Sequence, residues 1–223
     1  MGEYLLGLTS LMLRYLNTSK VFFIGHMALK QLLLEIIRIS QVSSILILYF
    51  FVYSGAEAGS LNSLSILKQN NYLALMRHTL APGFGDPDNF ELYDCNTQRN
   101  LSTEGITQAQ KIGKLIKSIG ILTASVYSSQ WCRCVDTANN LNLGAISILP
   151  PLNSFFQNLR HEKKQTNAMR RWIKNQKLDK PTILVTHQVN ITALTGIYPS
   201  SGEIVVLKRI KNSSLKLVGT FKL

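Results

Sequence analysis

YLALMRH, residues 72–78, is an apolar run that ends at an arginine and a histidine. Apolar runs of this length, bounded by polar residues, are typical of buried strands. Two later segments share the design: VYSS, residues 126–129, ends at two serines, and TILVTH, residues 182–187, ends at a histidine. In open α/β sheets, ligands bind beyond the carboxyl ends of the strands. The three segments therefore predict a sheet and also the edge of that sheet at which a site lies.

The rest of the chain from residue 102 alternates between helical and strand patterns. A hydroxyl N-cap and an acid, Ser102-Thr103-Glu104, begin a helix whose apolar residues keep the helical period up to Gly120. Further helices are predicted at 136–141 and 161–178, strands at 125–127 and 145–149, and a terminal hairpin at 203–210 and 215–221. Strands that alternate with helices form a mainly parallel sheet covered on both faces, so the predicted fold class is α/β.

Composition narrows the function classes. The chain has 223 residues, of which 46% are hydrophobic and 16% charged, so it can bury a sizeable core; disorder and a disulfide mini-scaffold are excluded. A net charge of +12 favours anionic partners, such as phosphorylated molecules, membranes or nucleic acid. We expect no nucleic acid partner, because the basic residues are not interleaved with aromatic ones. Only four histidines are present, which argues against a metal site built on several imidazoles.

The amino-terminal region has the pattern of an export signal. The uncharged run VSSILILYFFVY covers residues 42–53, and Lys30 and Arg38 precede it. This run has the length of a signal-peptide core and is short for a membrane span, which needs ~20 residues. Ala56 and Ala58 place small residues where a signal peptidase reads them. We therefore expect export, to the periplasm or a similar compartment.

Two alternatives about this leader stay open. Met27 could be the true start of the chain. Alternatively, the segment 1–58 could remain uncleaved and anchor the protein in a membrane, and we expect contact with the membrane only through this leader. In either case 59–223 is the expected folded domain. Residues 1–58 hold four of the 24 basic and three of the 12 acidic residues, so the domain itself carries about +11. The positive charge therefore belongs to the folded part.

Four residues of phosphate-binding type fall at or just after the three strand ends: Arg77, His78, Arg133 and His187. Arginine offers a rigid fork that matches two phosphate oxygens at once. A histidine among arginines stays neutral more readily, and a neutral imidazole can accept a phosphoryl group and pass it to water. A second, protonated histidine could stabilise charge in the transition state. This combination predicts phosphoryl transfer.

Four motifs in order resemble the histidine phosphatase superfamily, which includes phosphoglycerate mutases and phosphohistidine phosphatases. LMRH at 75–78 resembles its "LxRH" strand end, with Thr79 in place of the usual glycine, and LSTEG at 101–105 resembles its "L(T/S)xxG" helix start. The segment 127–138, YSSQWCRCVDTA, is similar to "xSSxxxRxxxTA", and VTH at 185–187 resembles the strand end that carries the second histidine. More narrowly, APGFGDPDNF, CNTQRNLS and THQVNITALTG resemble an exported bacterial group within the superfamily.

The resemblance implies a three-layer α/β/α sandwich like that of phosphoglycerate mutase. It also implies that His78 is the nucleophile, that Arg77, Arg133 and His187 hold the phosphoryl oxygens, and that neither a metal nor an organic cofactor is needed. The expected activity is a phosphatase that hydrolyses a phosphomonoester or a phosphohistidine, in a phosphorylated small molecule or a phosphoprotein. The alternative is a catalytically weak phosphate-binding or phosphoprotein-binding module of the same fold.

One departure from the family concerns the general acid. Many members have a glutamate some 20–30 residues after the second arginine, whereas this chain has PLNSFFQ at 151–157, without a carboxylate. Asp86, Asp88 or Glu91 could replace it if their loop folds over the site. Otherwise the substrate must have a leaving group that needs no strong acid, because general acid catalysis contributes ~10²–10⁴-fold. A mutase reaction is less well supported for the same reason.

Two further features of the sequence each allow two interpretations. Cys95 could form a disulfide with either Cys132 or Cys134 in an oxidising compartment, and so fix the loop beside the site. A basic helix near 160–180 is either a solvated face, which we favour, or a collar that attracts a polyanionic substrate.

Overall fold

The computed structural model describes residues 35, 37–43, 64–211 and 214–223, in two units, 1–56 and 57–223. In the first unit, the described residues are helical and exposed, and Arg38 pairs with Glu35 at 3.3 Å. The predicted start at Met27 and cleavage at Ala58 lie outside the described residues. None of the described helices is long and apolar enough to cross a membrane.

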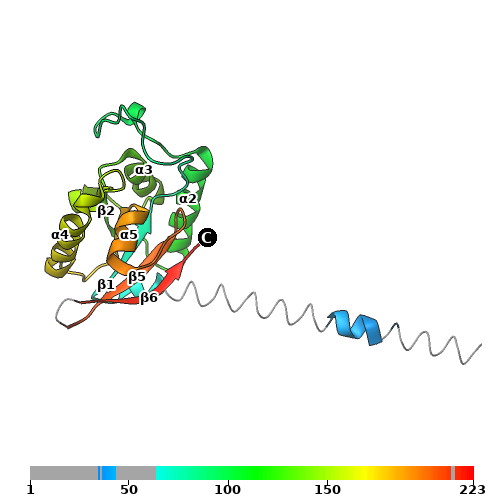
Figure 1. Cartoon of the computed structure of the whole chain (residues 1–223). Helices are drawn as coiled ribbons and strands as arrows, with labels where there is room; N and C mark the ends of the chain where they lie inside the picture. Colours follow the sequence, from blue (N-terminus) through cyan, green and yellow to red (C-terminus); the bar gives the residue numbers. More distant parts are fainter. Residues whose placement is uncertain (1–34, 36, 44–63, 212–213) are drawn as a thin grey trace, which may run out of the picture. The chain divides into compact units, whose positions relative to one another are not determined.

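The second unit is built on one six-stranded sheet, with the strand order β3-β2-β4-β1-β5-β6. Figure 1 labels β1, β2, β5 and β6 of this sheet. Its strands are β1 (Tyr72–Arg77), β2 (Ser125–Ser128), β3 (Ile146–Ile148), β4 (Thr182–Thr186), β5 (Ile204–Arg209) and β6 (Leu215–Phe221). The first four strands run parallel, while β5 and β6 are antiparallel and form the predicted hairpin. The sheet is thus mainly parallel, as predicted, and β1 and β2 flank β4.

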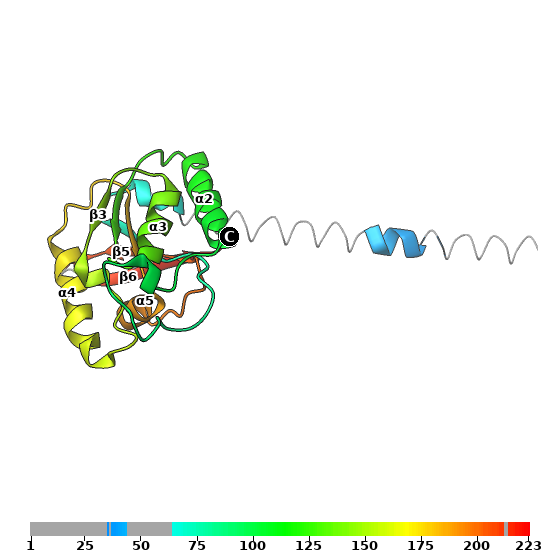
Figure 2. The same cartoon turned by 90° about the horizontal axis from the view of Figure 1, so that it is seen from above.

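Helices cover both faces of this sheet, which gives three layers (Figure 2). The helices are α2 (Thr103–Ser118), α3 (Cys132–Leu141), α4 (Glu162–Asn175) and α5 (Gln188–Thr195). One hydrophobic cluster joins α2 and α3 to one face, and a second joins α4 and α5 to the other. The α/β/α sandwich predicted from the sequence is confirmed.

The side chains of each strand point alternately to the two faces of the sheet, which explains why both faces are apolar. In β1, Ala74 and Met76 contribute to the cluster beneath α2 and α3, whereas Leu73 and Leu75 contribute to the one beneath α4 and α5. Successive side chains of a strand point to opposite faces, so a strand buried on both faces needs a continuous apolar run. The uncharged runs of β1 and β4 meet this requirement, and every residue of β4 is buried.

Two predicted helix boundaries were wrong by several residues. Helix α3 begins at Cys132 instead of 136, because its buried residues already start in that first turn: Cys132, Arg133, Cys134, Thr137, Ala138 and Leu141. Helix α4 ends at Asn175, three residues before the predicted end, and the chain turns extended at Gln176.

The start of α2 lies against the chain that follows His78. Ser102 caps the helix by accepting a hydrogen bond from the Gly105 amide at 3.1 Å, and its own amide donates to the Leu80 carbonyl. A Cβ at Gly105 would lie 2.0 Å from that carbonyl oxygen, far inside contact distance, so only glycine fits. The LSxxG motif therefore fixes how closely α2 approaches the loop beside the site.

Candidate active site

Three strand ends bring the predicted residues together. Arg77 and His78 lie at the end of β1, Ser129 follows β2, and His187 follows β4. The His78 amide donates to the Thr186 carbonyl at 2.9 Å, and the His78 and His187 ring centroids are 5.5 Å apart. Adjacent parallel strands thus place both histidines side by side, with Arg133 supplied by the first turn of α3.

The arginines and histidines of these segments line a pocket of about 120 Å³. Three arginines and two histidines take part in the lining: Arg77, Arg99, Arg133, His78 and His187. Other lining residues come from the loop after His78, from 154–157 and from the segment after His187; they include Phe84, Phe156, Gln157, Gln188 and Tyr198. A small pocket dominated by cationic and imidazole groups is suited to an oxyanion.

His78 is held as a neutral imidazole with a defined tautomer. Its Nδ1 lies 2.8 Å from the Thr79 carbonyl oxygen, which can only accept, so Nδ1 carries the proton and Nε2 keeps its lone pair. Burial, together with the nearby positive charge of Arg133, lowers the pKa of His78 to about 3. A buried imidazole with a free Nε2 at neutral pH has the form that a nucleophile requires.

Thr79 stands where the superfamily usually has glycine, and it ties the end of β1 to α3. Its amide donates to Thr137 Oγ1 at 3.0 Å, and the two hydroxyl oxygens are 3.1 Å apart. Thr137 in turn donates to the Arg133 carbonyl at 2.7 Å. The side chain at 79 therefore fits without disturbing the backbone that fixes His78, and it connects this backbone to the helix that carries Arg133.

His187 is held through the serine that follows β2. Its Nε2 lies 2.9 Å from Ser129 Oγ, and Ser129 donates its hydroxyl proton to Asn153 Oδ1 at 3.3 Å, so Nε2 is the donor to Ser129. Cys134 Sγ lies 3.5 Å from the same nitrogen. Burial and the charge of Arg133 lower the pKa of His187 well below its ordinary value, which keeps this ring neutral as well.

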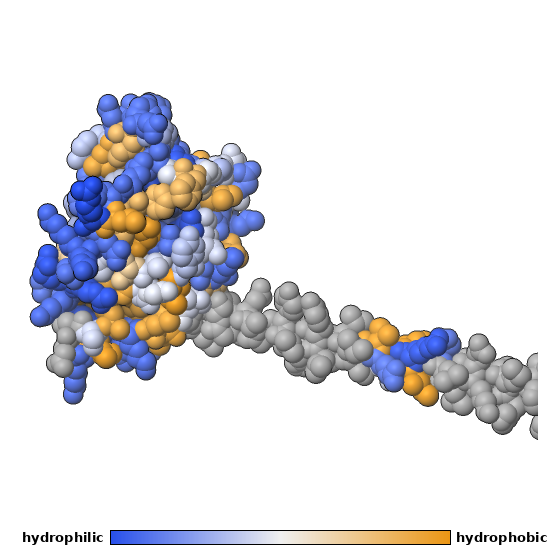
Figure 3. Space-filling model, viewed as in Figure 1, coloured by the Kyte–Doolittle hydropathy of each residue, from blue (hydrophilic) through white to orange (hydrophobic). Residues whose placement is uncertain are grey.

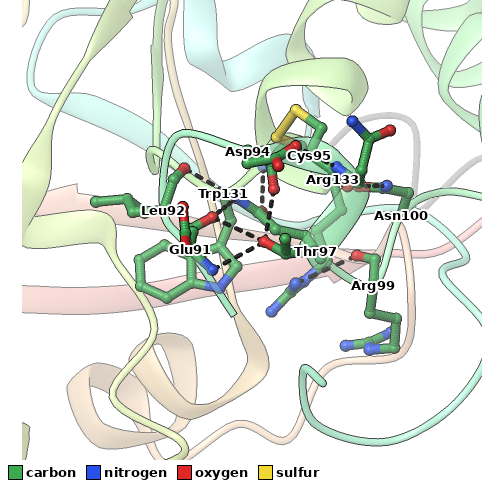
Figure 4. The surroundings of a disulfide bond; sticks show 12 residues. Glu91, Leu92, Asp94, Cys95, Thr97, Arg99, Asn100, Trp131 and Arg133 are labelled. Carbon is green, nitrogen blue, oxygen red and sulfur yellow. Dashed lines mark hydrogen bonds between the residues drawn. A yellow bond between two sulfur atoms is a disulfide. The ribbon is translucent and has the colours of Figure 1, made fainter. Parts of the chain in front are cut away.

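Arg133 is buried and forms an ion pair within the site. Its Nη1 and Nη2 donate to the two carboxylate oxygens of Asp86 at 2.6 and 3.1 Å. Nη1 also approaches the Arg99 carbonyl at 3.3 Å (Figure 4). Among the described residues, its Nε and that of Arg77 are buried donors without a partner. Both arginines line the pocket, and each has a buried Nε donor that is unsatisfied.

Arg99 was missed by the sequence reasoning. Its guanidinium lines the pocket and donates to the Ala81 carbonyl and, at 2.8 Å, to the Gly85 carbonyl. Burial lowers the pKa of Arg99, and the neighbouring Arg133 lowers it further. Its place two residues before the Leu101-Ser102 helix start was the available signal, since a motif that approaches the site brings the residues just before it close as well.

A disulfide closes the loop over the site. Cys95 is bonded to Cys132, which settles the choice left open by the sequence, and Figure 4 shows the bond beside Trp131 and Arg133. Cys134 is free and buried, and burial raises the pKa of its thiol to about 12. This thiol stays protonated and is not a nucleophile.

Of the three carboxylates proposed as general acids, the structure places only one at the pocket. Asp86 lines the pocket, whereas Asp88 and Glu91 are exposed and are not among the residues that line it. Burial alone would raise the pKa of Asp86, but hydrogen bonds from Arg133 and Trp131 outweigh it and hold the pKa below its ordinary value. Asp86 is therefore ionised and has no proton to donate at neutral pH, which argues against its role as the general acid.

The segment 151–157 supplies positioning and lining groups in place of a glutamate. Asn153 accepts from Ser129 and from the Gln130 amide, and Gln157 and Phe156 line the pocket. Within the described parts of the chain, no group of three or more His, Cys, Asp or Glu residues could hold a metal ion.

The basic helix α4 lies apart from this lining. Five cationic residues within the helix and two that flank it are exposed: Lys163, Lys164, Arg170, Arg171 and Lys174, with Arg160 and Lys177. Figure 3 shows a hydrophilic surface over this side of the domain. These positions agree with a solvated face, the reading favoured from the sequence.

Several solved structures share this fold. The protein histidine phosphatase SixA, complexed with tungstate, matches with a TM-score of 0.51 and 12% identity over 68% of this chain and 96% of SixA. The product of open reading frame Rv3214 from Mycobacterium tuberculosis matches with a TM-score of 0.53 and 15% identity, over 68% of this chain and 97% of that protein. Mycobacterial glucosyl-3-phosphoglycerate phosphatase Rv2419c, in complex with VO3, matches with a TM-score of 0.51 and 14% identity, over 68% of this chain and 100% of that protein. Neither the family models nor the curated proteins yield a match.

The chain thus shares its fold with SixA and with the Rv3214 product, and this is the fold that the resemblance of its four motifs implies. At 12–15% identity this likeness concerns the architecture, and the chemistry has to be argued from the residues of this chain.

Proposed function

We propose that the protein is a phosphatase that hydrolyses a phosphomonoester or a phosphohistidine through a covalent phosphohistidine on His78. The observation that carries this proposal is the state of His78: a neutral imidazole whose Nδ1 is tied to the Thr79 carbonyl, in a pocket lined by three arginines. This arrangement leaves Nε2 as the nucleophile, and its neighbours are the groups that bind phosphoryl oxygens.

The reaction has two halves. Nε2 of His78 attacks phosphorus while the bond to the leaving oxygen or nitrogen breaks, and the leaving atom takes a proton from solvent. Water then attacks the phosphohistidine, inorganic phosphate departs, and His78 regains its neutral form. Arg77 and Arg133, with their unpartnered Nε donors, and His187 hold the phosphoryl oxygens in both steps.

His187 changes its protonation state on binding in this proposal. In the empty site its ring is neutral, since burial and Arg133 lower its pKa. An entering phosphoryl dianion brings negative charge next to the ring, which favours the protonated form. The ring can then donate through Nδ1 to a phosphoryl oxygen while Nε2 stays bonded to Ser129.

The pocket favours leaving groups that need no strong acid. Among the described residues that line it, Asp86 is the only carboxylate, and it is paired with Arg133. A phosphoramidate nitrogen or an aryl oxygen departs without such help, whereas an alkyl alcohol does not. Phe84 and Phe156, whose rings meet edge to face at 4.8 Å, lie at the pocket and suit a planar leaving group. Phosphohistidine in a protein, or an aryl phosphate, is the favoured substrate type, and a mutase reaction fits less well.

Two proteins of the same fold bind analogues of phosphate: the SixA structure holds tungstate and the Rv2419c structure holds VO3. These complexes support an oxyanion as the ligand of this pocket. A binding module without efficient turnover is the second candidate, and the observation in its favour is the lack of an available acid among the described lining residues.

The test is phosphate release by the full chain, beside His78→Ala, on an aryl phosphate, sugar phosphates, a phosphoserine peptide and a phosphohistidine protein. We expect turnover by the wild type, fastest on the aryl and phosphohistidine substrates, and none by His78→Ala with an unchanged fold. Acid-labile, base-stable ³²P on the wild-type chain would identify the intermediate. Activity in His78→Ala would refute the mechanism; an inert wild type that binds vanadate would favour the binding module.

We further propose that the protein is exported. The pattern over 1–58 motivates this, and the Cys95–Cys132 disulfide supports an oxidising compartment. Cell fractionation with sizing of the mature chain tests it: a shortened soluble form means cleavage near Ala58, a full-length membrane form means an anchor, and a full-length cytoplasmic form overturns export.

A further inference from the structure

The Asp86 carboxylate is satisfied on both oxygens deep inside the site. Oδ1 accepts from Arg133 Nη1 at 2.6 Å and from the Arg99 amide at 3.2 Å. Oδ2 accepts from Arg133 Nη2 at 3.1 Å and from Trp131 Nε1 at 3.0 Å. The side chains of Arg133 and Asp86 are only 3% and 4% exposed, so neither charge is compensated by bulk water. Four donors on one buried carboxylate make it an anchor for Arg133.

The geometry of the pair leaves one edge of Arg133 without a partner at its Nε. A guanidinium has five N–H groups in a fixed fork, and the end between Nη1 and Nη2 is one of its two bidentate edges. Asp86 occupies that end, and the Arg99 carbonyl takes a further N–H of Nη1. The edge that remains is formed by Nε, which is buried without a partner, and the second N–H of Nη2. This is the edge with which Arg133 can bind two oxygens of a phosphoryl group.

The loop that carries Asp86 is itself held in place. Arg99 bonds the Ala81 and Gly85 carbonyls on either side of its turn, and Phe90 stacks on Trp131 with centroids 5.1 Å apart. Gln98 accepts from the Cys132 amide, and the Cys95–Cys132 disulfide joins the loop to the start of α3. The loop and Arg133 are therefore attached to the same turn of α3, which fixes Asp86 relative to the guanidinium.

We propose that Asp86 is a positioning residue: it binds the far end of the Arg133 guanidinium and so presents the Nε edge to the phosphoryl group. This inference rests on the proposed function in that the ligand is a phosphoryl group. Two other roles are possible for a carboxylate here, and each makes a different prediction. A general acid assists departure of a poor leaving group, and a competitor occupies the arginine until the ligand displaces it.

The experiment compares Asp86→Asn, Asp86→Glu and the exposed loop control Asp88→Asn in the full chain. Orthovanadate affinity is measured by calorimetry, and kcat/KM is measured on aryl phosphates with leaving groups of different basicity. We expect Asp86→Asn to weaken vanadate binding by a factor on the order of 10 or more, as for one partner of a buried charge pair. It should lower kcat/KM equally for all leaving groups. Asp86→Glu should recover part of the loss, and Asp88→Asn should match the wild type.

A second comparison covers the case in which Asp86→Asn does not fold, because it leaves the Arg133 charge buried and unpaired. Arg133→Gln and the double variant Asp86→Asn/Arg133→Gln avoid that charge. Arg133→Gln keeps the Asp86 carboxylate, which repels an anion, so if Asp86 acts only through Arg133 the double variant should bind vanadate at least as tightly as Arg133→Gln. A further loss in the double variant would overturn the proposal.

The remaining outcomes separate the competing roles. Tighter vanadate binding by Asp86→Asn would make Asp86 a competitor, and an unchanged affinity with a loss confined to poor leaving groups would make it an acid; both overturn the inference. A wild type that does not bind vanadate also overturns it. A wild type that binds vanadate without turnover refutes only the phosphatase, and the vanadate affinities still decide the role of Asp86.

Discussion

The site combines two regions that are held by different forces. One consists of the strand ends, where Arg77, His78 and His187 continue β1 and β4 and their backbone is fixed by the ladder of a sheet buried on both faces. The other is the loop 79–101, whose Asp86 and Arg99 are fixed by side-chain bonds to backbone and by a disulfide. The strand ends supply the chemistry, and the loop orients one of the arginines.

This division predicts how the two regions respond to substitution. Loss of a strand-end group removes a contact to the reacting phosphoryl group, while its backbone stays in the sheet. Loss of a loop group leaves each reacting group present but less well oriented. Activity should therefore depend more steeply on the strand ends, and stability more steeply on the bonds of the loop.

After the complete loss expected for His78→Ala, the largest effect is expected for His187→Ala. Removal of the His187 imidazole, a donor to a phosphoryl oxygen in the proposed mechanism, should lower kcat/KM by roughly 10²–10³-fold, the range for one transition-state donor. Steady-state kinetics on an aryl phosphate measures this. Ser129→Ala is the matched variant: it removes the partner of His187 Nε2 but not the ring, and should cost roughly tenfold or less. A larger loss for Ser129→Ala than for His187→Ala would contradict the assignment.

An intermediate effect is expected when the loop is released. The paired variant Cys95→Ser/Cys132→Ser removes a crosslink across 37 residues, which should lower the free energy of unfolding by roughly 2–4 kcal/mol. Because His78 and His187 do not depend on the loop for their place, kcat/KM should fall by less than about tenfold. Urea unfolding and kinetics measure the two quantities. Reductant should weaken the wild type and leave the variant unchanged; a complete loss of activity would mean that the loop does more than orient Arg133.

The same division explains what the sequence could predict. Strand ends follow from apolar runs such as 72–76 and 182–186, because burial on both faces imposes that pattern and the chain must leave the sheet where it stops. The pairing of Asp86 with Arg133, 47 residues away, has no periodic signal. Sequence reasoning placed Asp86 near the site but considered it as an acid, since it could not show that Arg133 and Trp131 occupy both oxygens.

The loop arginine was missed for a related reason. Arg99 acts through the Ala81 and Gly85 carbonyls, and a bond from a side chain to a distant backbone atom leaves no trace in composition or spacing. The choice between Cys132 and Cys134 depended on which face of α3 each occupies. Helix α3 begins earlier than predicted, and its first turn directs Cys132 to the loop and Cys134 to His187.

The smallest effect is expected from pH, and it tests the strand-end region alone. An ordinary histidine changes its charge near pH 6.5, but burial and Arg133 lower the pKa of His78 to about 3. The neutral nucleophile should therefore persist from pH 8 down to pH 5. Nitrogen chemical shifts of the His78 ring, assigned with His78→Gln, should stay constant over this range. The same ring should titrate near its ordinary pKa in the urea-unfolded chain.

The lowered pKa of His78 also determines the direction in which the stability of the fold changes with pH. Because the unfolded chain binds a proton at His78 more readily than the folded one, the free energy of unfolding should fall as the pH drops below about 6.5, towards pH 3. His78→Gln should show a shallower decline over that window, since it removes one of the two buried rings. An identical decline in both proteins, or a ring that titrates near pH 6.5 in the folded state, would mean that Arg133 and burial do not hold His78 neutral. The strand ends would then depend on the loop for their chemistry as well, because Asp86 would be neutralising the field that Arg133 exerts on the ring.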